Sequence, residues 1–132
     1  MQAGKSTSFI VDASLVLAFL LPDEKQSEAV KIFDQYTSGI IELVTPTLLP
    51  YEIINGLKGA LLRKRITIQQ TIQLTQQFLD LTIPLIETNL QEVLEISIDN
   101  KISVYDSSYL YLSRKYNLEL LTLDDTLKKP AK

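Results

Sequence analysis

The chain has 132 residues, of which 45% are hydrophobic and 22% are charged, a composition typical of soluble globular domains. It contains neither histidine nor cysteine, which excludes Ser-His-Asp and Cys-His nucleophiles, His/Cys zinc sites and an imidazole general base. Hydrolytic chemistry would therefore use Asp, Glu, Lys, Tyr, Ser or a metal held by oxygen ligands, which favour Mg²⁺ or Mn²⁺.

The net charge of −3 argues weakly against a nucleic-acid partner, because nucleic-acid binders usually carry a basic surface. Positive charge is nevertheless concentrated at the end of one expected helix, at Lys58, Arg63, Lys64 and Arg65. These side chains either steer a phosphate backbone or simply complement the helix dipole.

The N-terminus superficially resembles a secretory signal, since Lys5 precedes the apolar run Leu15–Leu21. Asp12 interrupts the apolar stretch, no small-x-small cleavage site follows, and the run is too short to span a bilayer. We expect a cytoplasmic protein without a membrane segment. Because no linker composition appears, we expect a single domain over residues 1–132, with frayed ends at residues 1–8 and 128–132.

The predicted elements alternate between strands and helices, and this alternation predicts an α/β fold with a parallel sheet. Ligands of such sheets bind beyond the carboxyl ends of the strands. From hydrophobic spacing and caps, we expect strands at Ser8–Val11, Ile40–Val44, Leu85–Ile86 and Leu118–Leu123. We expect helices at Ala13–Leu21, Glu24–Tyr36, Leu90–Ile98 and Val104–Tyr116. Two further helices would be capped by Thr47 and Thr67: the first runs to Lys64 with Pro50 in its first turn, and the second runs to Leu81 with Ile68, Ile72 and Leu79 among its apolar positions.

Two acids follow predicted strands. Asp12 ends the apolar run Phe9–Val11, and Asp124 ends the run Leu118–Leu123, so both would lie at the carboxyl edge of the sheet. The alternative for Asp12 is that it only caps the next helix, although Ser14 can also serve as that cap. Asp125 is a candidate cap for a terminal helix.

Two further acids lie near the starts of predicted helices. Glu52 stands in a strongly apolar segment, and on a helix it shares a stripe with Asn55, Gly56 and Gly59. Such a stripe indicates close approach of backbone or ligand, or else a helix-packing notch. Asp106 follows Ser103 by three residues, a spacing that also fits a simple capping box.

Together, Asp12, Glu52, Asp106 and Asp124 predict a carboxylate cluster at one crevice of the sheet. Carboxylates that close cannot all stay ionised unless a cation compensates them. A few carboxylates and waters are the usual ligands of Mg²⁺ at phosphate-processing sites.

With those residues in place, the sequence resembles the PIN-domain family, and within it the VapC-like toxins. The resemblance spans nearly the whole chain and rests on four short motifs in the family's order and with family-like separations: Val11–Ser14 (VDAS), Tyr51–Leu57 (YEIINGL), Tyr105–Leu110 (YDSSYL) and Thr122–Leu127 (TLDDTL).

This resemblance implies a three-layer α/β/α sandwich, a Mg²⁺- or Mn²⁺-dependent endoribonuclease activity on RNA, homodimerisation and inhibition by a cognate antitoxin. It assigns the catalytic and metal-binding roles to Asp12, Glu52, Asp106 and Asp124. It also makes Ser14, Asn55 and Thr122 candidates for supporting or substrate contacts. Separately, the concentration of positive charge makes Lys58, Arg63 and Lys64 candidates for steering the phosphate backbone.

Other functions remain to be weighed. A haloacid-dehalogenase-like phosphatase would carry Asp-x-Asp after the first strand, whereas this chain has Asp12-Ala13-Ser14. A response-regulator receiver would carry an acidic pair there and a phospho-accepting Asp after the third strand, neither of which is evident. A catalytically silent module that binds RNA or antitoxin is the remaining alternative, and the presence of all four acids counts against it.

Overall fold

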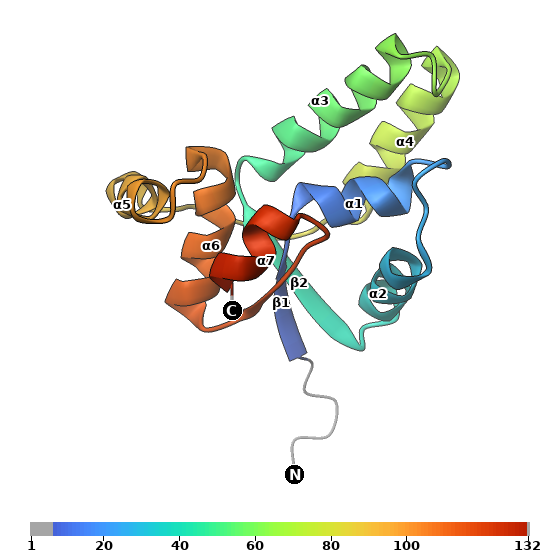
Figure 1. Ribbon diagram of the computed structural model, residues 1–132. Coiled ribbons are helices and arrows are strands. Elements are labelled where there is room, and N and C mark those ends of the chain that lie inside the picture. Colours follow the sequence, from blue (N-terminus) through green and yellow to red (C-terminus); the bar gives the residue numbers. More distant parts are fainter. Residues whose placement is uncertain (1–6, 132) are drawn as a thin grey trace.

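The computed structural model describes residues 7–131, and its centre is a parallel four-stranded sheet (Figure 1). The strands are Thr7–Val11 (β1), Ile41–Pro46 (β2), Leu85–Ile86 (β3) and Glu119–Leu121 (β4), in the order β3-β2-β1-β4. The helices are Ala13–Leu20 (α1), Ser27–Thr37 (α2), Leu49–Leu62 (α3), Ile68–Asp80 (α4), Leu90–Asn100 (α5), Val104–Tyr116 (α6) and Asp125–Ala131 (α7).

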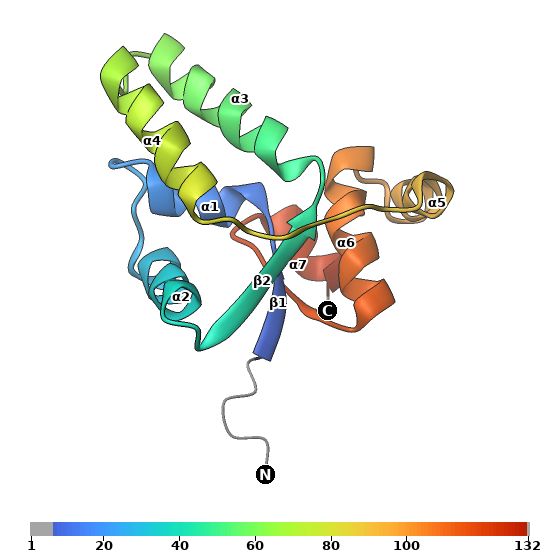
Figure 2. The same ribbon diagram turned by 180° about the vertical axis from the view of Figure 1, so that it is seen from behind.

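Helices cover both faces of the sheet. Helix α6 contacts β1, β2 and β4 on one face and carries α5 on its outer side, whereas α2 contacts β2 on the other face. Figures 1 and 2 show α5 and α6 on one side of the strands and α2 on the opposite side. The predicted three-layer α/β/α sandwich is therefore confirmed.

The middle of α6 is buried on all sides. All residues from Ser107 to Ser113 are buried, because the helix lies between the sheet and α5. Its buried serines do not leave unpaired hydroxyls, since Ser107 donates to the Ser103 carbonyl at 2.7 Å and Ser113 donates to the Leu118 carbonyl at 2.6 Å. Such local bonds allow polar residues in the middle of a helix that is buried on all sides there.

Several predicted boundaries are wrong. Thr47 does not cap α3: the helix begins after Leu48, which makes no side-chain cap bond, because β2 continues to Pro46 and leaves Thr47 in the turn. Helix α2 begins at Ser27 rather than at Glu24. Strand β4 is only Glu119–Leu121. The Leu118 N–H donates to the Ser113 carbonyl in the turn that ends α6, and the residues after Leu121 lead to the site.

The prediction of frayed ends is also wrong where the structure describes them. Ser8 pairs with Glu42 in the sheet, and the backbone of residues 128–131 belongs to α7. The remainder of that prediction, at residues 1–6 and 132, lies outside the described residues.

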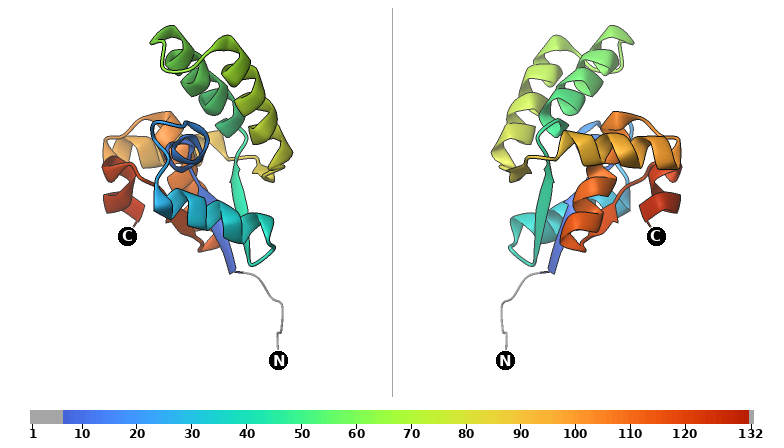
Figure 3. Two further views of the ribbon diagram at one scale, coloured as in Figure 1. Left: turned by 90° about the vertical axis from the view of Figure 1, so that its right-hand side faces the viewer. Right: turned by 90° about the vertical axis from the view of Figure 1, so that its left-hand side faces the viewer.

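Helices α3 and α4 form a hairpin that projects from the sheet (Figure 3). The apolar residues whose spacing predicts α4 face solvent there, with Ile68, Ile72 and Leu79 exposed by 65%, 66% and 54%. Only Phe78 of α4 is buried. No helix within residues 7–131 has the length and apolar character needed to cross a bilayer.

Candidate active site

Asp12 lies at the carboxyl end of β1 and is the N-cap of α1. Its side chain is 3% exposed and accepts hydrogen bonds from the Leu15 backbone N–H at 3.2 Å, from Ser14 Oγ at 2.7 Å and from Thr122 Oγ1. The cap and the site are therefore the same residue, and Ser14 is not the cap. Together, these three hydrogen bonds hold the Asp12 carboxylate in one orientation.

The hydroxyls of Ser14 and Thr122 join the ends of two neighbouring strands. Ser14 Oγ accepts from the Leu123 backbone N–H at 3.0 Å, and Thr122 Oγ1 accepts from the Asp124 backbone N–H at 2.9 Å. The two oxygens lie 3.4 Å apart. Both predicted supporting residues thus hold Asp12 and the chain that leads to Asp124.

Glu52 lies in the first turn of α3 and is bound by a residue that the sequence did not single out. The buried Tyr109 of α6 donates its phenol hydroxyl to Glu52 Oε1. One signal was available: Tyr109 follows Asp106 by three residues, so a helix places the two on one face. In the sequence it reads as an ordinary core aromatic.

Asp106 and Asp124 also lie at helix starts. The backbone N–H of Asp106, in the first turn of α6, donates to Ser103 Oγ at 2.9 Å, while its own half-buried side chain remains available for the site. Asp124, not Asp125, caps α7, because its carboxylate accepts from the Thr126 N–H at 2.8 Å. Asp125 is the first residue of that helix.

The four acids form one electrostatic cluster. Burial raises the pKa of Asp12, of Glu52 and of Asp106, and in each case a neighbouring acid raises it further. Asp124 repels both Asp12 and Asp106, whereas Glu52 is repelled by Asp106 and Asp12. The pKa of the Tyr109 phenol is raised by burial first and then by Glu52.

Helix dipoles offset part of this repulsion. The N-termini of α1, α3, α6 and α7 each carry one of the acids, at the cap or in the first turn. A helix N-terminus bears a partial positive charge and stabilises a nearby carboxylate by about 0.3–1 kcal/mol. The same partial charges favour anionic groups of a substrate.

Comparison with known proteins agrees with this geometry. The PIN domain model matches residues 9–132. The chain belongs to the PIN-domain family. A curated relative, Ribonuclease VapC3 of Pyrobaculum aerophilum, is 30% identical over 128 residues, which cover 92% of this chain and 95% of the relative. The crystal structure of PAE2754 from the same organism, at 22% identity and a TM-score of 0.75, covers 100% of this chain and 85% of that one, and it supports the fold.

The donor set of this PIN domain fits a hard divalent cation, although no tight cage is present. Within residues 7–131, no three acidic side chains gather closely enough to make a ready-formed metal-binding group. Mg²⁺ usually takes one or two carboxylates directly and keeps several waters. Acids that repel one another without forming a tight cage suit an ion held partly through water.

The predicted substrate-contacting residues on α3 divide by position. Asn55, one turn after Glu52, lines a surface hollow together with that acid. Arg63 lies at the outer end of α3, about 17 Å along the helix axis from Glu52 at 1.5 Å per residue, and Lys64 follows it in the turn of the hairpin. Lys58 is exposed about halfway along. These cations can reach only a long substrate that extends along α3.

The remaining cation of that basic segment is already paired. Arg65 Nε donates to Asp23 Oδ2 at 2.7 Å, and its Nη2 also contacts Glu24. These bonds tie the tip of the α3–α4 hairpin to the connection between α1 and α2. Arg65 therefore stabilises the fold of the PIN domain, and its charge is already compensated by Asp23 and Glu24.

The glycine stripe beside Glu52 is explained by packing. A Cβ built on Gly56 would lie 2.6 Å from Leu17 Cδ1, so α3 can approach α1 closely only with glycine at this position. A Cβ on Gly59 would meet only Arg63 Nη1, at 3.4 Å. The notch interpretation therefore holds for Gly56.

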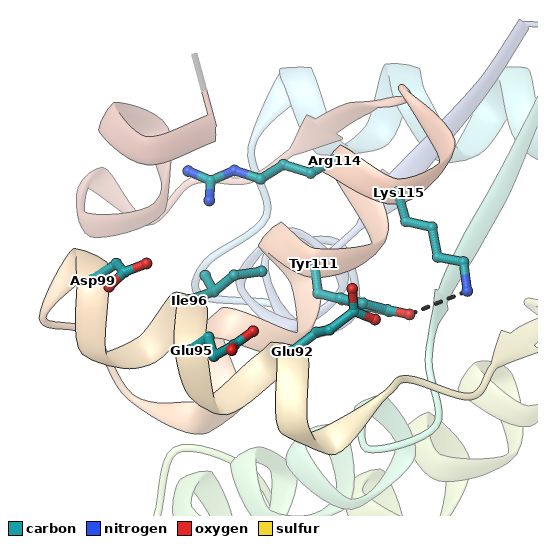
Figure 4. Close-up of a pocket in the computed structure, with 7 residues that line it drawn as sticks. All are labelled: Glu92, Glu95, Ile96, Asp99, Tyr111, Arg114 and Lys115. Atoms are coloured by element: carbon teal, nitrogen blue, oxygen red, sulfur yellow. Dashed lines mark hydrogen bonds between the residues drawn. The ribbon is translucent and has the colours of Figure 1, made fainter.

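A second hollow, of about 560 Å³, lies between α5 and α6 and contains none of the four acids (Figure 4). The α5 acids Glu92, Glu95 and Asp99 line it opposite the α6 cations Arg114 and Lys115. Lys115 Nζ also donates to the Tyr111 hydroxyl at 3.2 Å, the bond drawn in Figure 4. The acids and cations that line this hollow largely compensate one another, which distinguishes the hollow from the acid cluster.

Proposed function

We propose that this PIN domain is a metal-dependent endoribonuclease that hydrolyses RNA phosphodiester bonds. The observation that carries the proposal is the convergence of Asp12, Glu52, Asp106 and Asp124, mutually repelling and partly buried, on four helix N-termini. The ribonuclease name of the VapC3 relative supports RNA as the substrate.

Asp12 and Asp106 are the proposed direct ligands of Mg²⁺ or Mn²⁺, with Glu52 and Asp124 completing the shell or orienting water. Held by these acids, such an ion would supply a water of lowered pKa and would stabilise charge on the leaving oxygen. The oxygen of the attacking water would bond to phosphorus and lose a proton to a carboxylate such as Glu52. The bond from phosphorus to a ribose oxygen would break, and that oxygen would take a proton from solvent.

The side chains of this protein supply positioning and proton transfer. Ser14, Thr122 and the Leu15 N–H hold Asp12 in one orientation. Tyr109 holds Glu52, whose raised pKa makes it a better proton acceptor near neutral pH than an exposed glutamate.

The resemblance to VapC-like toxins leads us to propose three further properties. The protein would be the toxin of a toxin–antitoxin pair and bind a cognate antitoxin; it would form a homodimer; and it would act in the cytoplasm. Exposed apolar side chains on α4, namely Ile68, Ile72 and Leu79, are available for such protein contacts.

A cleavage assay tests the proposed activity. RNA cleavage by the wild type is expected with Mg²⁺ or Mn²⁺ and is expected to stop in excess EDTA. Asp12→Asn and Asp106→Asn should each reduce the rate by more than the roughly 10- to 100-fold that loss of an outer-shell partner costs. Asp99→Asn, an exposed acid of the α5–α6 hollow, is the matched control and should cleave as the wild type does.

Two outcomes would contradict the proposal. Undiminished cleavage in EDTA would exclude the metal-dependent mechanism. Binding of RNA without cleavage under any metal condition would favour the catalytically silent module instead.

A further inference from the structure

Two tyrosines next to the acid cluster have unusually exposed rings. Tyr51 is 82% exposed and Tyr105 is 64% exposed, although aromatic side chains are usually largely buried. Within residues 7–131, neither phenol hydroxyl forms a hydrogen bond and neither ring contacts another ring. Neither ring is therefore held in place by a polar or aromatic partner within the fold.

The two rings line one hollow of about 500 Å³, together with Leu48, Glu52 and Asn55. Tyr51 immediately precedes Glu52 in the first turn of α3, and Tyr105 immediately precedes Asp106 in the first turn of α6. Figures 1 and 2 both show the start of α3 beside the start of α6. The hollow is therefore continuous with the acid cluster, and Glu52 belongs to both.

The chemistry of the hollow fits a planar aromatic group with polar edges. Leu48 and the two rings supply apolar walls, while the Asn55 amide supplies one donor and one acceptor group. Unpaired bases of RNA are typically bound by stacking on aromatic side chains and by hydrogen bonds to their edges. An acidic peptide would be repelled by Glu52.

We propose that Tyr51 and Tyr105 form a stacking site for an unpaired base of the RNA, next to the phosphate that is cleaved. The proposal rests on the proposed function for the substrate class, and it adds the part of the surface that receives the base. It requires single-stranded RNA, because the bases of a duplex are already stacked and paired. Stacking tolerates any base, so selectivity at this site would come from Asn55.

Binding to single-stranded RNA tests the proposal. The probe is a fluorescein-labelled random pool of RNA about 12 nucleotides long, within the usual range for single-strand sites. Binding is measured in the presence of Ca²⁺, which, like Mg²⁺, binds oxygen ligands. Loss of one stacking ring typically weakens binding by roughly 5- to 150-fold. We expect losses in this range for Tyr51→Ala and Tyr105→Ala.

The controls separate stacking from folding. Tyr51→Phe and Tyr105→Phe should bind as the wild type does, because stacking needs the ring and not the hydroxyl. Tyr116→Ala removes another exposed tyrosine, at the far end of α6, and should leave binding unchanged. A duplex of the same length should bind more weakly than the single strand and should be insensitive to Tyr51→Ala.

A spectroscopic variant reports stacking directly. The chain contains no tryptophan, so Tyr51→Trp introduces a single indole whose fluorescence should be quenched when a base stacks on it. Tyr116→Trp, its matched control, should not respond to RNA. This readout would not change if Tyr51 merely supported the fold.

The proposal is overturned if the wild type does not bind the single-stranded pool, or if Tyr51→Ala and Tyr105→Ala bind it as tightly as the wild type. If these two variants bind RNA normally but no longer bind an apolar peptide that the wild type binds, the hollow is a protein-binding site instead. Because binding is measured without cleavage, failure of the metal-dependent mechanism alone leaves this test intact.

Discussion

Asp12 illustrates how one side chain can satisfy two interpretations that look exclusive in the sequence. Its carboxylate caps α1 through the Leu15 N–H and also lies among the acids of the site. A cap needs one acceptor oxygen, and a carboxylate has two oxygens with several lone pairs. Capping therefore does not count against a functional role for an acid at the end of a strand.

Asp106 provides a test of the same question on α6. Its side chain carries a charge that burial and Asp124 both disfavour, while the cap of α6 is Ser103 Oγ and not this carboxylate. Asp106→Asn should therefore leave the metal-free protein as stable as the wild type or more stable. Thermal melts in EDTA at neutral pH measure this.

Ser103→Ala is the matched variant for that experiment. It removes the cap and should cost about 1 kcal/mol of stability. If Asp106→Asn melts as low as Ser103→Ala, the main role of Asp106 is structural.

Tyr109 and Thr122 show what single residues reveal in a sequence and what they do not. Thr122 lies beside Asp124 in a motif, so its involvement could be predicted. The bond from Tyr109 to Glu52 joins residues 57 positions apart, and the spacing of Tyr109 from Asp106 does not by itself distinguish this tyrosine from a core aromatic. Contacts between distant elements depend on packing, which local periodicity does not report.

At the scale of elements, the predicted starts of α2 and α3 were wrong although both helices were predicted. The helix at Val104–Tyr116 was predicted with its observed bounds and its Ser103 cap. The start of α3 was wrong because Thr47, a good capping residue, is held in the turn after β2. A local preference of about 1 kcal/mol is readily overridden by the course of the sheet.

The notch between α1 and α3 gives a prediction at this scale. Alanine is favoured over glycine in a helix by about 1 kcal/mol, so Gly59→Ala should stabilise the protein. Gly56→Ala receives the same gain but must displace Leu17, and overpacking typically costs about 1–3 kcal/mol. Chemical denaturation should therefore find Gly56→Ala less stable than Gly59→Ala, and equal stabilities would contradict the notch.

For the whole molecule, the alternation of strands and helices was sufficient to predict the parallel sheet, whereas the three layers were predicted from the resemblance to the PIN-domain family. The order β3-β2-β1-β4 could not be obtained from periodicity. It places β1 in the interior with β2 and β4 beside it, and this arrangement brings the acids after β1 and β4 together. The motifs identified the acids, and the topology explains why they meet.

The acid cluster should also govern the response of the whole molecule to pH and metal. The pKa values of Asp12, Glu52 and Asp106 are raised in the folded state, so the folded protein binds more protons than the unfolded chain. The contribution of this cluster to stability should rise as pH falls from neutral through the raised values toward the unfolded ones.

Two measurements check that expectation. In EDTA, the difference in melting temperature between Asp106→Asn and the wild type should shrink as pH falls, because protonation removes the same charge. Both proteins contain the Asp23–Arg65 pair, whose contribution to stability has the opposite pH dependence because the pKa of Asp23 is lowered. That contribution therefore cancels in the difference between their melting temperatures.

At neutral pH, Mg²⁺ or Mn²⁺ at 100 times its dissociation constant should stabilise the wild type by about 2.7 kcal/mol. A melt insensitive to both ions would contradict the metal site.

The bond between Asp12 and Thr122 spans 110 positions of the chain, and this separation determines when the site can exist during synthesis. A ribosome adds about 5–20 residues per second and works from the N-terminus, so Asp12 emerges long before its partner. Until β4 has been made and has paired with β1, neither Thr122 nor Asp124 can join the other acids. A nascent chain of this protein therefore carries an incomplete acid cluster until β4 and the residues after it have been made.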